Sequence, residues 1–487
     1  MSKTNIFRRY SRTFWTANTM ELFERWAWYG MFMLLALYLT GSKDEGALGF
    51  TQVQKGRLMG PVVAILYFLP LITGAIADRY GFKKVLIVSY TIMASGYIML
   101  AYIQDYTLFY IAFLWLAIGA SLFKPVITAT IAKTTDSKTS SVGFGLFYMM
   151  VNLGAFIGPI VASKMRVFSW QTVFWISAGV IILNMILVLL IYKEPKRELS
   201  EEPLMKSIKT MFNNVWLAVK DLKFLLFLII IIGFWSMYNQ LFYTLPVFID
   251  QWMDTSLVYD FLYSVSPGLA NAIGTSEGIV EPEIMTNLDA MYIVLFQVLI
   301  STLVMRFRPL TAMTSGIVVA SFGLALSFAT NNPFYLVFSL FIFAVGEMSS
   351  SPKINEYIGK IAPKDKVALY MGASFIPMAG GNLIAGYISG DVYGKMSDKI
   401  NLLRTDLIEK GINVPQLSAD FTQNDLLKLG AQKLQMTQQE LTTYLWNNYQ
   451  PGKIWVVLLA IGLTTALALF LYDYFLIRSS GQKTQQI

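Results

Sequence analysis

Twelve apolar runs constrain the fold of this chain more than any other feature of its sequence. A helix of about 20 residues crosses the hydrocarbon core of a bilayer, and the runs are long enough for that. Only 14% of the 487 residues are charged and 55% are apolar, whereas about a quarter of a soluble domain is charged. We therefore predict an all-α membrane protein with twelve transmembrane helices. The runs lie near residues 14–40, 56–77, 84–104, 108–133, 142–164, 171–193, 223–248, 287–305, 309–330, 333–360, 367–390 and 453–477.

A charged stretch separates the first six runs from the last six. Two halves joined in this way are typical of a two-bundle membrane protein with a site between the bundles, near the bilayer midplane. Another arrangement of twelve helices stays open. We predict an N-terminal six-helix bundle at 1–193, a cytoplasmic linker at 194–222, and a C-terminal six-helix bundle at 223–487 with external segments 248–286 and 391–452.

Lysine and arginine in the loops orient the chain, because cytoplasmic loops of membrane proteins carry an excess of both. The segment 1–14, the linker 194–222 and the loop at Lys83 and Lys84 each contain several Lys or Arg, whereas 248–286 contains none. We predict a multi-pass protein of the cell membrane with both termini on the cytoplasmic side.

The external segment 391–452 carries many lysines, which long translocated loops tolerate. Thr437 and Glu440 in this segment match the capping box that begins a helix. Part of this segment is therefore predicted to be helical.

The chain contains no cysteine and no histidine. These absences exclude disulfides and thiolate sites and remove the commonest metal ligand, so any proton that the protein carries must bind a carboxylate. The sequence shows no metal cluster, no nucleophile beside its base and no phosphate-binding loop. We expect no metal, no cofactor and no enzyme activity. The net charge of +8 lies mostly in short loops, which favours membrane orientation over nucleic-acid binding.

The first run carries Glu21, Glu24 and Arg25 in the sequence ELFERWAWYG. A charge at the centre of a membrane helix costs about 2.5–3.5 kcal/mol on insertion scales, so such residues usually face a cavity or a partner. Their spacing places all three on one helix face. One carboxylate can pair with Arg25, which leaves the other free to bind and release a proton. We predict that the three residues couple the protein to protons; a structural cluster near the helix end is the alternative.

Two further runs carry a deep charge, Lys124 in GASLFKPVIT and Glu347 in FAVGEMSSSP. A Lys in the first half and a Glu in the second can pair and hold a gate shut until substrate or proton competes. A static buried pair is the alternative. Lys353 and Glu356, three residues apart, are expected to form a local structural pair.

Polar and aromatic residues within the runs are candidates for binding a substrate. Aromatic residues in membrane helices more often face lipid or pack against neighbours, so each is a weaker candidate than the charged residues. The candidates are Tyr29, Tyr67, Tyr148, Asn152, Trp235 and Gln240.

Together these residues resemble the proton-dependent oligopeptide transporter family of the major facilitator superfamily. ELFERWAWYG resembles the family motif E-x-x-E-R-F-x-Y-Y-G, and GAIADRYGFKK resembles the superfamily's cytoplasmic loop motif. FKPVIT, FYMMVNLGA and GEMSSSP are similar to family motifs of the fourth, fifth and tenth helices. The resemblance spans nearly all twelve helices and implies the major facilitator fold, with twelve transmembrane helices in two six-helix bundles.

The resemblance also implies a function, the import of di- and tripeptides by alternating access, driven by inward proton flow. By family role, Glu21 and Glu24 are protonation sites, Arg25 and Lys124 bind the peptide carboxylate, and Glu347 binds the peptide amine. The fork of a guanidinium suits a carboxylate because it can bind both oxygens. The residues implied to contact the peptide are Tyr29, Tyr67, Tyr148 and Asn152.

The chain departs from the family pattern in both halves. Many members have Arg at the position of Phe32, and an acid is usual at that of Asn239. Since both charges are absent here, we predict that the outer gate closes by packing of Phe32 against aromatic residues such as Tyr238. The other departures are Trp28, Lys353 and Ser374.

Two alternatives to peptide import stay open. One is a major facilitator transporter of another small amphoteric or anionic solute, imported or exported. The other is a non-transporting receptor or scaffold, although such a protein has no use for charges deep in the membrane. For the leading function, we expect a monomer in membrane lipid whose partners are a short peptide and protons, with no nucleic acid.

Overall fold

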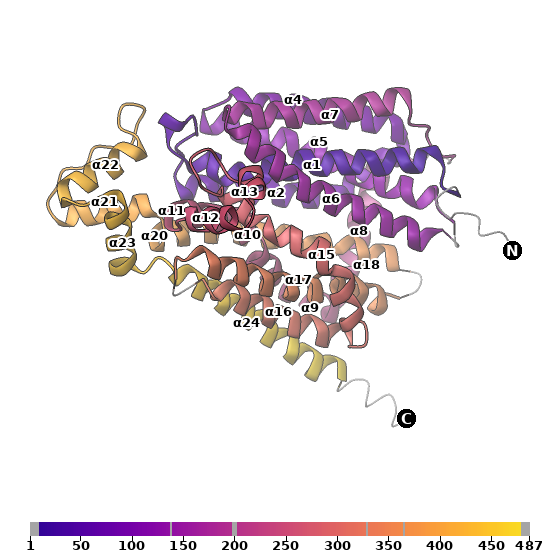
Figure 1. Ribbon diagram of the computed structural model, residues 1–487. Helices are drawn as coiled ribbons and strands as arrows, with labels where there is room; N and C mark the ends of the chain where they lie inside the picture. Colours follow the sequence, from indigo (N-terminus) through magenta and orange to yellow (C-terminus); the bar gives the residue numbers. More distant parts are fainter. Residues whose placement is uncertain (1–8, 137–138, 197–201, 328–329, 364–365, 479–487) are drawn as a thin grey trace. The chain divides into compact units, whose positions relative to one another are not determined.

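The computed structural model describes residues 9–136, 139–196, 202–327, 330–363 and 366–478 (Figure 1). All regular secondary structure in these ranges is helical, which confirms the predicted all-α class. The first part of the chain forms α1 (Arg12–Thr40), α2 (Gln52–Phe68), α3 (Pro70–Tyr80), α4 (Phe82–Tyr102), α5 (Tyr106–Lys133), α6 (Ser140–Arg166) and α7 (Trp170–Leu190).

Helices α2 and α3 form one bent element. Pro70 begins α3, and a proline cannot donate the backbone hydrogen bond that would continue the preceding helix. The two helices bend by 44° at this break.

The linker contains a helix that the sequence analysis did not predict, α8 (Leu204–Val219). It packs against α3. The ring of Phe212 also lies 6.1 Å from that of Phe68 in α2. Residues 197–201 of the predicted linker lie outside the described residues.

The second part of the chain begins with α9 (Leu222–Tyr238) and two short continuations of it, α10 (Gln240–Tyr243) and α11 (Leu245–Trp252). The long helices that follow are α15 (Leu288–Val304), α16 (Pro309–Ala325), α17 (Pro333–Ile361), α19 (Phe375–Tyr387) and α24 (Lys453–Leu471). Shorter elements are α12 (Ser256–Val265), α13 (Pro267–Ile273), α14 (Pro282–Thr286), α18 (Val367–Ala373), η3 (Ile388–Val392), α20 (Tyr393–Met396), α21 (Lys399–Glu409), α22 (Gln423–Leu434), α23 (Gln438–Tyr449) and η4 (Tyr472–Arg478).

Each of the twelve predicted runs is helical over most of its described length. Within the described residues, eight helices are long and apolar enough to cross a membrane, and the bent pair α2–α3 makes a ninth. The others are shorter or more polar: α1 carries the charged cluster, α16 has 17 residues, and a turn at Ser374 separates α18 from α19. Residues 328–329, in the predicted run 309–330, lie outside the described residues.

Packing divides the chain into two compact units. Unit 1 comprises Met1–Phe32 and Val62–Lys220, and unit 2 comprises Met33–Pro61 and Asp221–Ile487. The end of α1 and the start of α2 therefore pack with the second half of the chain, which differs from the predicted boundary at residue 193. In unit 1, α4 packs against α5 and α7; in unit 2, α17 packs against α15 and α16, and α9 against α19.

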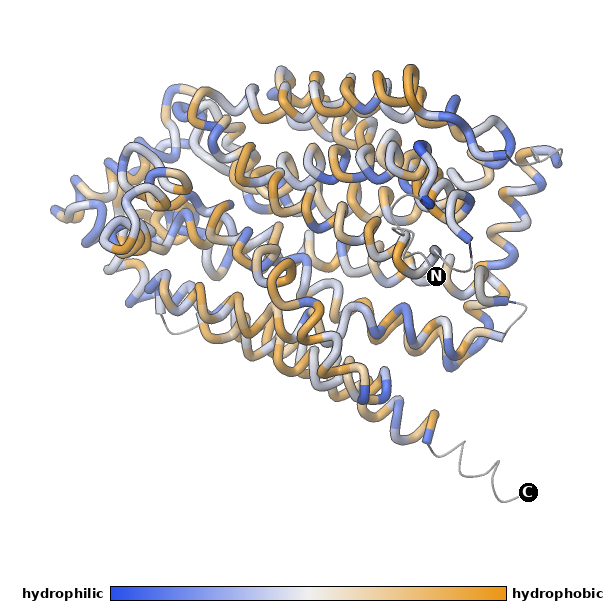
Figure 2. The backbone as a smooth tube through the Cα atoms, turned by 45° about the vertical axis from the view of Figure 1, so that its right-hand side comes forward, coloured by the Kyte–Doolittle hydropathy of each residue, from blue (hydrophilic) through white to orange (hydrophobic). Residues whose placement is uncertain are grey.

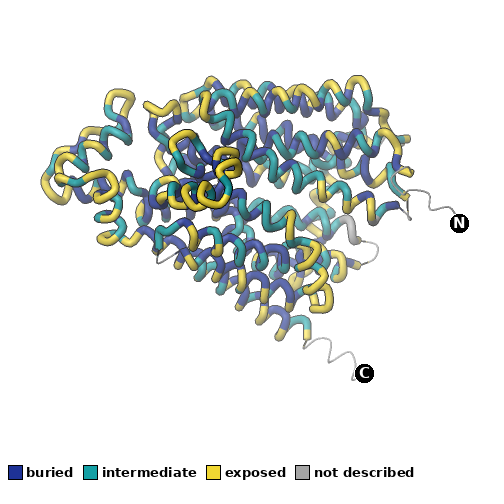
Figure 3. The backbone as a smooth tube through the Cα atoms, in the orientation of Figure 1, coloured by how far each residue is buried: buried dark blue, intermediate teal, exposed yellow. Residues whose placement is uncertain are grey.

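The surfaces of the long helices are apolar. Leu190 of α7 is 79% exposed and Val298 of α15 is 81% exposed. Figure 2 shows hydrophobic residues along the long helices, and Figure 3 shows many exposed residues in α21–α23. Such apolar helix surfaces suit contact with lipid, where the backbone hydrogen bonds are satisfied within each helix.

The predicted capping box in the segment 391–452 is confirmed. The Thr437 hydroxyl accepts from the backbone N–H of Glu440, and the Glu440 carboxylate accepts from that of Thr437. Within unit 2, Asn424 of α22 donates to Asp44, 3.0 Å away in the loop after α1. This contact ties α22 to that loop.

Candidate functional site

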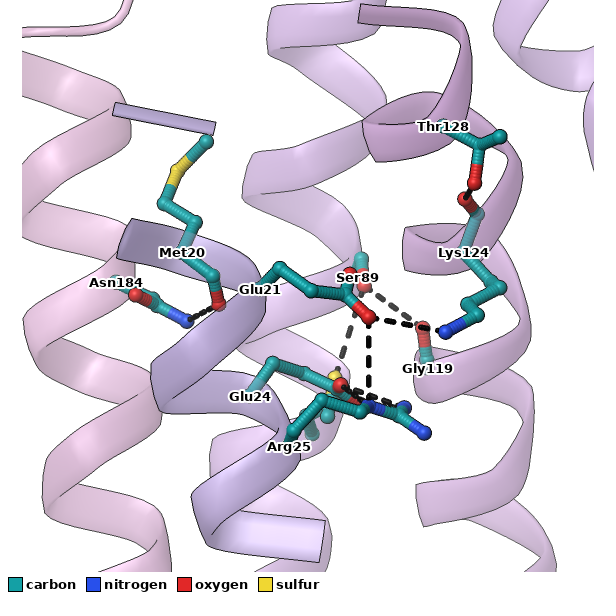
Figure 4. A network of polar contacts seen from close by, with 10 residues as sticks. Met20, Glu21, Glu24, Arg25, Ser89, Gly119, Lys124, Thr128 and Asn184 are labelled. Atoms are coloured by element: carbon teal, nitrogen blue, oxygen red, sulfur yellow. Dashed lines mark hydrogen bonds and ion pairs between the residues drawn. The ribbon is translucent and has the colours of Figure 1, made fainter. Parts of the chain in front are cut away.

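Four charged side chains meet inside unit 1 (Figure 4). The guanidinium of Arg25 donates to both oxygens of Glu24, at 2.6 and 2.8 Å. The ammonium of Lys124, on α5, lies 2.9 Å from Oε1 of Glu21. Both glutamates are fully buried. The expectation that one carboxylate lacks a cation is therefore wrong, because the helix spacing that predicted the cluster says nothing about a lysine on another helix.

Close contact with α6 holds α1 in place. A Cβ at Gly154 would lie 2.8 Å from Cβ of Arg25, and one at Gly158 would lie 2.5 Å from the carbonyl oxygen of Trp26. Contacts this short admit only glycine. Asn184 of α7 adds a hydrogen bond of 2.9 Å to the carbonyl of Met20. The backbone that carries the charged cluster is thus held from two sides.

Pro125 directly follows Lys124 and interrupts the hydrogen bonds of α5. Because proline has no N–H, the carbonyl of Ser121 loses its partner within the helix. The hydroxyl of Thr73, on α3, donates to this carbonyl at 2.7 Å. The segment that presents Lys124 is therefore connected to α3.

Aromatic side chains surround the cluster in unit 1. The guanidinium of Arg25 lies 5.8 Å from the ring centre of Tyr29, and Tyr67 lies within electrostatic range of both. The sequence analysis missed Tyr90 and Tyr97 of α4, which are buried and lie within electrostatic range of Glu24. Among the described residues their hydroxyls have no hydrogen-bond partner. Their spacing of seven on one helix face was the available signal.

Two other predicted binding residues lie on a more open part of α6. Tyr148 is 50% exposed. The amide of Asn152 donates to the carbonyl of Tyr148 at 2.9 Å. Their spacing places them on one face of the helix.

The predicted gate residue Phe32 is buried and stacks on Trp28, with ring centres 5.3 Å apart. In unit 2, Asn239 ends α9 and donates to the carbonyl of Trp235 at 2.8 Å. Gln240 is fully buried and donates to the carbonyl of Ser236.

Glu347 lies in unit 2 beside a second acid that the sequence analysis missed, Asp289 of α15. Their side chains are hydrogen-bonded to each other, and Glu347 also accepts a hydrogen bond from Tyr238. Lys124 and Glu347 thus each have partners within their own unit, and their predicted pairing with each other stays a prediction. The predicted local pair of Lys353 and Glu356 is confirmed at 2.7 Å.

Lys55 of α2 is a further buried charge that the sequence analysis missed. Its ammonium donates to the carbonyl of Tyr243 at 2.7 Å and lies 5.5 Å from the ring centre of Tyr393. All three residues belong to unit 2. A lysine at the start of an apolar run looks like an interfacial residue in the sequence, so no local signal distinguished it.

Comparison with known proteins places the chain in a family. The model of the Major Facilitator Superfamily matches residues 19–385. The chain belongs to this superfamily. Members are multi-pass membrane proteins, and the family and fold are those of transporters.

Among its relatives is dipeptide and tripeptide permease A of Citrobacter koseri, which is 23% identical over 79% of this chain and 85% of the permease. The peptide transporter YePEPT of Yersinia enterocolitica is 28% identical over 36% of the chain, a match that spans 34% of that transporter. A solved structure of a POT family transporter in complex with 5-aminolevulinic acid has a similar fold. Its TM-score is 0.66 at 19% identity, over 94% of this chain and 96% of that one.

Proposed function

We propose that this protein imports di- and tripeptides together with protons, by alternating access. The observation that carries the proposal is the buried cluster of two glutamates and two cations in unit 1. The relatives that are named as peptide permeases support the choice of solute. The protein would work as a monomer in the cell membrane, with both termini cytoplasmic.

The cluster links proton binding to the binding of an anionic group. In the present structure Glu21 forms an ion pair with Lys124, and Glu24 forms one with Arg25. Protonation of a glutamate would weaken its ion pair and release a cation for the carboxylate of a solute. Proton and solute would then bind together, as symport requires. Lys124, Glu347, Phe32 and Asn239 would act as gating residues. They too would exchange their contact partners during transport.

Transport of another small amphoteric solute is the second candidate. The POT family transporter with a similar fold was solved in complex with 5-aminolevulinic acid. Such a compound carries an amine and a carboxylate but no peptide bond, and the same fixed charges would bind it.

Uptake by reconstituted protein tests the proposal. In proteoliposomes with an imposed pH gradient, labelled dipeptides should accumulate, and Glu21→Gln or Glu24→Gln should abolish accumulation while leaving some exchange of labelled for unlabelled solute. Glu356→Gln is the matched control, because Glu356 belongs to unit 2 and is paired there with Lys353 and Lys360. Full gradient-driven uptake by both cluster variants would remove these glutamates from the mechanism. Uptake of 5-aminolevulinic acid but of no dipeptide would favour the second candidate.

A further inference from the structure

Two buried carboxyl groups meet in unit 2, Asp289 at the start of α15 and Glu347 within α17. The residues are 7% and 8% exposed, and their side chains are hydrogen-bonded to each other. An ionised carboxylate can only accept a hydrogen bond. A hydrogen bond between these two groups therefore requires a proton on one of them.

The described residues of unit 2 around the pair supply hydrogen bonds but no cation. Tyr238 of α9 donates to Glu347, and Tyr292 of α15 donates instead to the carbonyl of Val337. Lys353, the first cation after Glu347 along α17, is 2.7 Å from Glu356.

Helices α14 and α16 likewise supply no cation to the pair. Helix α14, which packs against α15, contributes another buried acid, Glu283. Helix α16, which packs against α17, contains no titratable residue. Oδ1 of Asp289 and Oε2 of Glu347 have no hydrogen-bond partner within the described structure. Within the described part of unit 2, the groups around the pair are thus neutral or acidic.

We propose that Asp289 and Glu347 form one proton-binding site, in which two carboxyl groups share a single proton. Two carboxylates in contact and shielded from water cannot both be ionised without a cation beside them. The proton therefore belongs to the pair and not to either residue. It can leave only when water or a cationic group reaches the two carboxylates, so its release depends on a change of conformation or on an arriving ligand.

The site would add a proton to those carried by the glutamates of α1. This coupling role rests on the proposed function, whereas the presence of the shared proton does not. Neither Asp289 nor the pair was among the residues expected to carry protons.

Infrared spectroscopy of the purified protein in lipid nanodiscs at neutral pH, without solute, tests for the proton. A protonated carboxyl group has a C=O stretching band that a carboxylate lacks. In Asp289→Asn or Glu347→Gln, the new amide can donate to the remaining carboxylate, so the hydrogen bond persists without a proton. We expect each variant to lose one protonated-carboxyl band.

The matched control is Asp473→Asn, also in unit 2. Asp473 is buried like the pair, but it lies 3.1 Å from Arg308 and 2.8 Å from Arg478. It needs no proton, so this variant should keep every band. Retention of every band in the double variant Asp289→Asn/Glu347→Gln, which has no carboxyl group at the site, would show that the pair holds no proton. Loss in only one variant would show that one residue holds the proton alone, which also contradicts sharing.

The coupling role is tested separately, by the number of protons moved per solute in proteoliposomes. Asp289→Asn should reduce this number by one relative to the wild type. An unchanged number would show that the shared proton is static. If the wild type moves none of the tested peptides, the proposed function fails, while the infrared result still decides the proton site.

Discussion

At the scale of single residues, the charges buried in this protein have polar partners. Glu24 binds Arg25, Glu21 binds Lys124, and Asp289 is hydrogen-bonded to Glu347. A buried charge without a partner is strongly destabilising, so each of these groups needs another. The same requirement lets the pairs respond to binding. When a proton or a solute binds one member of a pair, the other member needs a new partner.

We expect Gly154 on α6 to be needed for both stability and uptake, as the charged residues are. Gly154→Ala would bring a methyl group against the backbone of Leu22 and the Cβ of Arg25. We expect a loss of about 1–3 kcal/mol of stability, typical of overpacking, together with reduced uptake because Arg25 is displaced. Thermal unfolding in detergent and uptake in proteoliposomes measure the two effects.

Gly145→Ala is the control on the same helix, since no atom lies within 4 Å of the added methyl group. It should unfold at the temperature of the wild type or above it. Equal behaviour of the two variants would contradict the close contact between α1 and α6.

At the scale of elements, interruptions of the helices are repaired by side chains from other helices. The carbonyl of Ser121, freed by Pro125, accepts from Thr73. The carbonyl of Tyr243, at the end of α10, accepts from Lys55. A buried carbonyl without a partner costs about 1–3 kcal/mol, so these contacts stabilise the breaks. The breaks can then be retained next to charged residues.

Thr73→Val removes the hydroxyl at nearly constant shape. We expect it to lower the free energy of unfolding by about 1–3 kcal/mol, because the Ser121 carbonyl is left buried and unpaired. Thr73→Ser keeps the donor and should be closer to the wild type. Chemical unfolding of the three proteins in detergent gives the comparison, and a Thr73→Ser protein as unstable as Thr73→Val would assign the loss to packing.

The capping box of α23 predicts a dependence on pH. Hydrogen bonds from the backbone and the hydroxyl of Thr437 lower the pKa of Glu440. A lowered pKa stabilises the fold above the ordinary carboxyl range, near pH 4.3, and that contribution is lost as pH falls below it. Amide hydrogen exchange at the start of α23, corrected for its intrinsic rate, should accelerate at low pH.

Glu440→Gln keeps the hydrogen bonds of the box but cannot titrate. Exchange at the start of α23 in this variant should no longer respond to pH in the acidic range. The same acceleration in both proteins would place the titrating group elsewhere.

At the scale of the whole molecule, the chain consists of two units whose boundary does not follow the sequence. Residues 33–61 pack with the second half of the chain, so α1 contributes to both units. Its first part carries the charged cluster of unit 1, and its last turns pack in unit 2. Helix α1 is therefore a direct connection between the cluster and the unit that contains Glu347.

The proposed orientation can be tested directly, because the chain has no native cysteine. Ser264 lies in α12, within the segment 248–286 that we propose to be external, and Thr210 lies in α8; both are exposed. In intact cells, Ser264→Cys should react with a membrane-impermeant maleimide, and Thr210→Cys should react only after permeabilisation. The reverse pattern would place both termini outside.

The order of residues along the chain was enough to predict the helical class, the twelve runs, the capping box at Thr437 and the pair of Lys353 and Glu356. Each of these depends on contacts within a run or a single helix turn, which local sequence describes. The partner of Glu21, the acid beside Glu347 and the buried position of Lys55 join residues that are about 60 to 190 positions apart. The tertiary structure decided these contacts, because burial and charge pairing depend on which helices pack together, and helix periodicity alone does not specify that packing.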